Sequence, residues 1–124
     1  MKKHRSLLAA ASLALAGGLM LSDAAMAYTA LAISGNHGSR YGWATGQRSP
    51  NAAANTALGY CGDGCRVVLH FASGCGAYAA DQARGSSVFG WGTGGSRRQA
   101  EATALGECRH QGGSDCIVRV QACE

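Results

Sequence analysis

Three groups of residues in this 124-residue chain could carry chemistry: a glycine pattern, a set of histidines and aspartates, and six cysteines. The pattern Gly90-x-Gly92-x-x-Gly95 is spelled like a dinucleotide-binding loop. Such a loop needs a parallel βαβ unit and an acidic residue about 20 positions further on, beyond a second strand. Glu107 and Asp115 both precede the next apolar strand. The sequence therefore predicts no nucleotide and no other cofactor.

The histidines and aspartates would matter for a small secreted hydrolase of cell-wall or other polymers. His37, His70 and His110 do not recur at matching positions, and a metal site needs convergent ligands, so we expect no metal. Asp63 and Asp115 do correspond, and paired carboxylates can do acid–base work, but both also suit tight turns. The sequence therefore leans away from an enzyme and names no catalytic residue. The hydrolase stays open as the alternative.

The cysteines indicate cross-links rather than a metal. They are Cys61, Cys65, Cys75, Cys108, Cys116 and Cys123. An even count in a small exported chain is typical of a disulfide framework, which supplements a modest core. Zinc tolerates the first spacing, but the last three cysteines do not form a second tight pair.

The N-terminus predicts export. A basic start, an apolar run over 7–21 and the small-residue site Ala25-Met26-Ala27 are the three parts of a signal peptide. We expect cleavage after Ala27, which leaves a single domain over 28–124, secreted or periplasmic and without a membrane anchor. Three basic residues and one acidic residue leave with the peptide, so the net charge falls from +4 to +2. No basic tract remains, and we expect no nucleic-acid partner.

The rest of the chain reads as a duplication. The segments RYGWATG (40–46) and TALGYC (56–61) return as VFGWGTG (88–94) and TALGEC (103–108), about 48 residues later. Two copies are too few for a solenoid. We therefore predict one domain with a pseudo-twofold axis, built from repeat one (28–75) and repeat two (76–124).

Each repeat predicts the element order ββαβ. Gly, Asn and Asp mark hairpin turns, Ser49-Pro50 and Ser96 are helix-start signals, and β-branched runs follow the helices. The expected elements are hairpins 29–34/40–45 and 76–80/87–92, alanine-rich helices that end after Cys61 and Cys108, and strands Val67–Phe71 and Ile117–Val120. The fold class is α+β, with a mainly antiparallel sheet and two helices packed against it.

This order favours one of fifteen possible cysteine pairings. In each repeat a short turn separates the helix-end cysteine from the strand cysteine, which makes Cys61–Cys65 and Cys108–Cys116 plausible staples. Cys75 and Cys123 would end equivalent strands, and the symmetry axis could bring them together. The geometry that would decide among the pairings is not visible in a sequence.

The largest side chains lie on the second hairpin strands as Tyr41, Trp43, Phe89 and Trp91. Within each strand the two rings point the same way, because side chains alternate. One interpretation is an aromatic platform for a glycan or a partner protein, with Arg40, Arg48 and Arg97 as a polar rim. The other is that the rings fill the space between the sheet and its small-residue helices.

The paired YGW and FGWG segments, the helix ends ALGYC and ALGEC, and the ending GGSDCIVRV together resemble the domain-of-unknown-function 4189 family over 28–124. The resemblance implies a small secreted or periplasmic bacterial protein and supplies no catalytic residues. The sequence thus predicts a binding or interaction module in the cell envelope or outside the cell, such as an inhibitor or effector-like partner of another secreted protein. The expected partner is a protein or a cell-envelope component.

Overall fold

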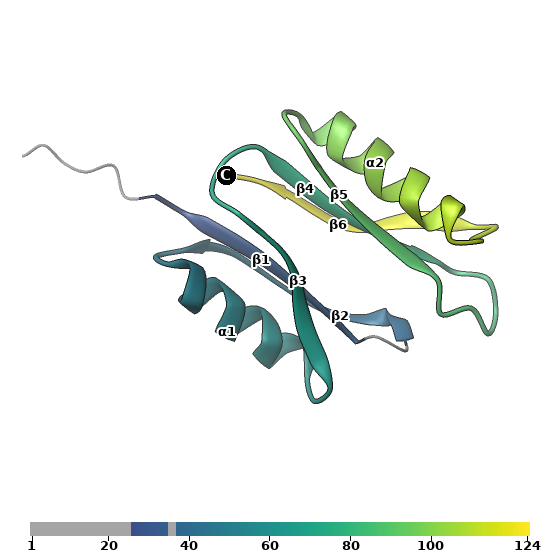
Figure 1. Ribbon diagram of the computed structural model, residues 1–124, viewed down its shortest axis with the longest axis horizontal. Coiled ribbons are helices and arrows are strands. Elements are labelled where there is room, and N and C mark those ends of the chain that lie inside the picture. The colour runs from purple at the N-terminus through teal and green to yellow at the C-terminus, as the bar shows by residue number, and fades with distance from the viewer. Residues whose placement is uncertain (1–25, 35–36) are drawn as a thin grey trace, which may run out of the picture.

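The computed structural model describes residues 26–34 and 37–124, so the predicted signal peptide lies outside it except for Met26 and Ala27. The elements in order are β1 (Tyr28–Ser34), β2 (His37–Gln47), α1 (Pro50–Cys61), β3 (Cys65–Phe71), β4 (Cys75–Asp81), β5 (Phe89–Gly94), α2 (Arg97–His110) and β6 (Cys116–Cys123). Two antiparallel sheets form, in the orders β2-β1-β3 and β5-β4-β6. They lie between the two helices, so the layers run α1, sheet, sheet, α2 (Figure 1). No helix in the described ranges is long and apolar enough to cross a bilayer.

The strand pairings confirm the predicted fold class and the double ββαβ order. Each repeat forms its own three-stranded sheet. The two sheets also share a β-bulge. Val68 in β3 and Arg119 in β6 are each an extra residue in the register with the central strand of their sheet. The two bulges occupy equivalent positions, as expected of a duplication.

Both helices begin as the sequence predicts. The Ser49 hydroxyl accepts a hydrogen bond from the Ala52 amide at 3.0 Å, and Pro50 occupies the first helical turn. Ser96 accepts from the Gln99 amide at 3.2 Å. The Gln99 side-chain oxygen in turn accepts a hydrogen bond from the amide of Gly95, one residue before the cap.

The end of α2 corrects one prediction. The helix α1 ends at Cys61, and Gly62 follows with a φ of 99°. The helix α2 runs past Cys108 to His110. Its last turn is continuous because the Gln111 amide still donates to the Glu107 carbonyl at 3.0 Å.

The disulfides are Cys61–Cys65, Cys108–Cys116 and Cys75–Cys123. The expectation that Cys75 and Cys123 end equivalent strands brought together by the symmetry axis was wrong. Cys75 begins β4 rather than ending β3, and it is the register partner of Cys123 in the neighbouring strand β6. The bond therefore fastens one sheet, over the longest loop of the three, where chain entropy contributes most. Three disulfides are typical of proteins outside the reducing cytosol.

Small residues let each helix lie directly on its sheet. A Cβ added to Gly42 in β2 would come within 1.9 Å of the Ala57 carbonyl oxygen in α1. In repeat two, a Cβ on Gly90 would meet the Cys108 amide nitrogen at 2.4 Å. Around these glycines the layer is almost entirely alanine and cysteine. At Gly42 and Gly90 the helix backbones therefore lie so close to the strands that no side chain has room there.

The larger side chains occupy the opposite faces, between the two sheets. Leu31 and Ile33 from β1 meet Tyr78 and Ala80 from β4 in one buried cluster. Tyr41, Trp43, Phe89 and Trp91 pack around it, half-buried. The sequence-based alternative that put these rings under the helices was wrong, because strand alternation gives that face to the glycines next to each ring.

Two carboxylates tie loops to this frame. Asp81, 8% exposed, accepts from the Ala83 amide at 3.2 Å and from the Asp115 amide at 2.9 Å. It thus holds both the β4–β5 loop and the α2–β6 loop. The Glu124 carboxylate accepts from the Thr29 hydroxyl and from the Gly46 amide, which links the end of repeat two to repeat one.

The close approach of each helix to its sheet predicts opposite effects for two kinds of glycine. Gly42 and Gly90 face the helix from the sheet, whereas Gly59 and Gly106 lie on the side of the helix that faces away from the sheet. Gly42→Ala and Gly90→Ala would force a backbone to move, and we expect each to lower the free energy of unfolding by about 1–3 kcal/mol. Gly59→Ala and Gly106→Ala are the controls, since a Cβ at these helical positions meets nothing within 4 Å. We expect the controls to raise stability by up to about 1 kcal/mol. Urea unfolding measures all four, and equal effects on the two sides would contradict the packing.

Asp81 predicts an acid-dependent contribution to stability. The hydrogen bond of Ser86 lowers the pKa of Asp81 below 3.8, backbone amides act in the same direction, and burial opposes them. A lowered pKa stabilises the fold above pH 3.8, and that stability is lost as the pH falls through the folded value. We expect Asp81→Asn to be less stable at pH 7, with the gap to the original chain narrowing below about pH 4.

The measurement is the urea midpoint from pH 7 to pH 2, with Asp63→Asn as control because Asp63 is exposed in a turn. A gap for Asp81→Asn that stays constant over the whole range would show that the carboxylate charge is not what holds the loops.

Candidate binding site

A cavity of about 470 Å³ lies at the outer edge of β5. Its lining consists of Arg66, Ser87, Val88, Phe89, Gly90, Trp91, Glu107 and Gln111. These residues come from β3, from the end of the β4–β5 loop, from β5, and from the end of α2. The volume lies in the range of small-ligand and peptide pockets.

The apolar wall of the cavity is formed by Phe89 and Trp91. They are two residues apart in β5 and therefore share a face. Their ring centroids are 6.0 Å apart and the planes differ by 17°, so the rings are stacked. Phe89 also contacts Tyr78, with ring centroids 6.2 Å apart, and this contact anchors the wall to the buried cluster between the sheets. The wall is thus held in place by the core.

Opposite charges flank this wall. Arg66 comes from the other sheet, where it is the register partner of Ile33 and shares its inward face. Glu107 comes from α2, and its Cβ lies over Gly90, within 2.7 Å of where a Cβ there would be. Within residues 26–34 and 37–124, neither charged side chain has a hydrogen-bond or ion-pair partner. Both charges are therefore available to a ligand.

Repeat one differs at the positions that make the cavity. Arg40 stands where repeat two has Val88, and its guanidinium donates to the Asp63 carbonyl at 2.7 Å and to the Cys61 carbonyl at 3.3 Å. It thus spans the place between β2 and the end of α1. The shorter Val88 leaves the corresponding place in repeat two open.

Only two of the four predicted aromatic residues line this cavity. Tyr41 packs against Tyr78 with ring centroids 4.9 Å apart, and Trp43 packs against Phe71 with ring centroids 6.4 Å apart. The four rings therefore do not form one continuous platform. Burial raises the pKa of Tyr78 above its ordinary value, the neighbouring Tyr41 adds to this, and Arg119 opposes it. Tyr78 thus stays neutral as a core residue.

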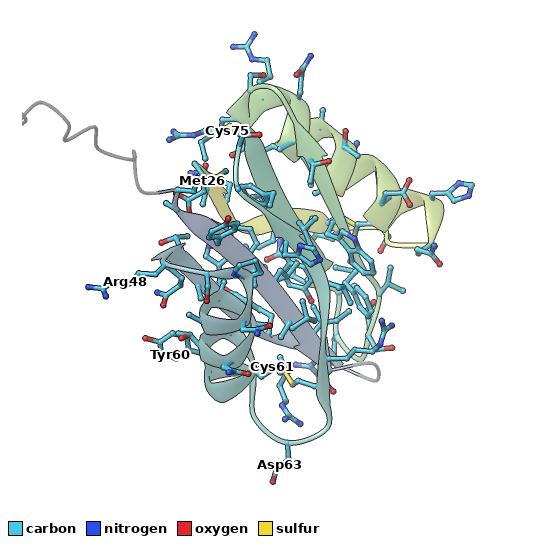
Figure 2. All side chains as sticks on the ribbon, turned by 60° about the vertical axis from the view of Figure 1, so that its left-hand side comes forward. Met26, Arg48, Tyr60, Cys61, Asp63 and Cys75 are labelled. Atoms are coloured by element: carbon cyan, nitrogen blue, oxygen red, sulfur yellow. A yellow bond between two sulfur atoms is a disulfide. The ribbon has the colours of Figure 1, made fainter. Side chains whose placement is uncertain are left out.

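The predicted polar rim lies elsewhere. Arg40 caps the end of α1, and Arg97 is exposed at the start of α2. Arg48 projects away from the molecule beside α1 (Figure 2). Arg66, Glu107 and Gln111 take the role instead, and sequence reasoning missed them. One signal was available, which is that the two repeats differ at these positions. When the repeats are aligned, Glu107 corresponds to Tyr60 and Arg66 corresponds to Ile117.

The hydrolase residues do not meet in the described structure. Asp63 points outward at the tip of the α1–β3 turn (Figure 2), while Asp115 lies in the α2–β6 loop of the other repeat and accepts from the Gln82 side chain at 3.0 Å. His70 and His110 are exposed on β3 and at the end of α2. His37 begins β2, but its side chain lies outside the described part. No group of three or more His, Cys, Asp or Glu in the described ranges could hold a metal.

The lining of the cavity offers groups that could contact a ligand. Its stacked rings offer apolar area, and Arg66, Glu107, Gln111 and Ser87 offer donors and acceptors at its borders. A hydroxyl nucleophile needs a base beside it, and Ser87 makes no hydrogen bond to Glu107 in the described structure. Recognition is the chemistry that this geometry supports.

The comparisons with known proteins agree with the fold. The NMR structure of Rv1813c from Mycobacterium tuberculosis is similar, with a TM-score of 0.54 and 26% identity, over 100% of this chain and 98% of that one. No curated protein matches the chain. The family described as "Domain of unknown function (DUF4189)" matches residues 28–123, which is essentially the whole folded region. The chain belongs to the DUF4189 family.

Proposed function

We propose that this protein is an exported binding module whose contact site is the cavity at the edge of β5, and that its partner is another protein outside the cytosol. The observation that carries the proposal is the cavity itself. It combines a stacked aromatic pair with two opposite charges from different layers of the fold, and neither charge has a partner among residues 26–34 and 37–124. Aromatic and arginine side chains are the residues that most often dominate protein interfaces.

The mixture of charges supports a protein partner. A polyanion such as nucleic acid would require several basic side chains along one face. Here one arginine and one glutamate border the same cavity. A polypeptide supplies both charges, together with apolar side chains for the rings.

Export to the periplasm or to the exterior is part of the proposal. It is supported by the signal-peptide pattern over 1–27 and by the three disulfides. Cross-links also suit a binding protein of this size, since a rigid scaffold loses less entropy when it binds.

A reciprocal exchange between the repeats tests the site. Val88→Arg introduces into repeat two the residue that repeat one has at this position, and its guanidinium is expected to fill the cavity. Arg40→Val is the matched control, because it makes the opposite change on the other sheet. We expect both variants to keep the fold, which thermal unfolding of the oxidised chain would check.

The readout is capture by the oxidised chain over 28–124 from envelope and culture-supernatant extracts of the organism that makes it. We expect one stoichiometric protein with the original chain and with Arg40→Val, and at least tenfold less with Val88→Arg, a difference of about 1.4 kcal/mol. Equal capture by all three would move the site away from β5. Capture of nothing, together with turnover of peptidoglycan, would replace the binding module with the hydrolase.

A further inference from the structure

We propose that the cavity takes an extended segment of the partner protein, which adds to the free edge of β5 as a fourth strand of that sheet. This inference rests on the proposed function, because it states how the partner enters the same site. Added strands of this kind obtain affinity from main-chain hydrogen bonds and specificity from alternating side chains.

The backbone of β5 presents its free groups to the cavity side. The Val88 carbonyl accepts from the Asp81 amide at 2.9 Å, so Val88 points its backbone groups toward β4. In an antiparallel pair this direction alternates. Phe89, Trp91 and Thr93 therefore point their N–H and C=O groups away from β4, and no backbone hydrogen bond outside the sheets involves them in the described residues.

Among the four edge strands, β5 alone lacks the features that protect an edge. Proteins blunt edges with bulges, charges or proline. In the described structure β2, β3 and β6 each have an extra residue that breaks their register, and each contains an arginine. By contrast, β5 pairs with β4 in unbroken register and reads Phe-Gly-Trp-Gly-Thr-Gly, with no charged residue.

The cavity extends around both faces of this edge, which fits a strand better than a compact ligand. Phe89, Trp91 and Arg66 border it on the face between the sheets. Glu107 borders it on the helix side, over Gly90. An extended peptide sends successive side chains to opposite faces. Charge complementarity then places apolar and acidic side chains on the Arg66 side and a basic side chain on the Glu107 side.

The probe is a library of random seven-residue peptides displayed on phage, selected against the oxidised chain over 28–124. We expect enriched peptides to carry apolar residues at every second position. At one of these positions we also expect an acidic residue, on the Arg66 side. At one of the positions between them we expect a basic residue, on the Glu107 side. The best peptide is then synthesised with blocked ends, so that its terminal charges do not contribute.

Thr93→Pro removes one outward N–H of β5 without removing a bond to β4, and proline is tolerated at such edge positions. Thr45→Pro is the control at the sequence-equivalent position of β2, where an extra residue breaks the pairing with β1. We expect Thr93→Pro to weaken binding of the peptide at least tenfold and Thr45→Pro to leave it within twofold. In the unmodified chain, which avoids any folding defect of a variant, the peptide should slow hydrogen exchange of the Phe89, Trp91 and Thr93 amides at least tenfold.

The outcomes separate this inference from the proposed function. Peptide binding that Val88→Arg abolishes, with no protection of these amides and no effect of Thr93→Pro, overturns strand addition and leaves the binding site in place. Failure to enrich any peptide also overturns strand addition, and failure to capture a partner as well overturns both. A dimer of the chain that Thr93→Pro dissociates would make a second copy the occupant and would equally overturn the inference.

Discussion

The contact between each helix and its sheet is the constraint on which the rest of this structure depends. At Gly42 and Gly90 the helix backbone lies so close to the strand that even a methyl group has no room. Strand alternation then sends the neighbouring rings to the opposite face. Each repeat by itself would therefore expose an aromatic surface, and the two repeats bury these surfaces against each other. The pairing of two sheets follows from the close packing of two helices.

The site arises where the two repeats have diverged. A symmetric pair would offer the same surface twice, but Arg40 bridges to the end of its helix while Val88 leaves a gap. Glu107 replaces a tyrosine that is 72% exposed in repeat one. The shared frame, with its helix caps, bulges and disulfides, holds these few differing side chains in place. Stability thus depends on what the repeats share, and the proposed recognition depends on what they do not.

The proposed recognition through a free strand edge suits so small a scaffold. The core between the sheets fixes Phe89 and Trp91, and Asp81 fixes the loop that leads into them. A partner segment would meet backbone groups and rings that are already in position, so little further ordering is required. The other three edges are broken by extra residues and carry charge, which would direct such a segment to β5.

The sequence by itself determined the element order, the helix starts and the internal duplication, because turn glycines, serine caps and a repeated pattern are local signals. Only the tertiary structure decided that the strands divide into two sheets and that Cys75 and Cys123 are neighbours within one of them. It also decided the composition of the cavity. Arg66 and Glu107 are 41 positions apart in the chain and meet the rings only because one sheet packs over the other. Local patterns specify the elements, whereas the meeting of distant side chains depends on how the layers pack.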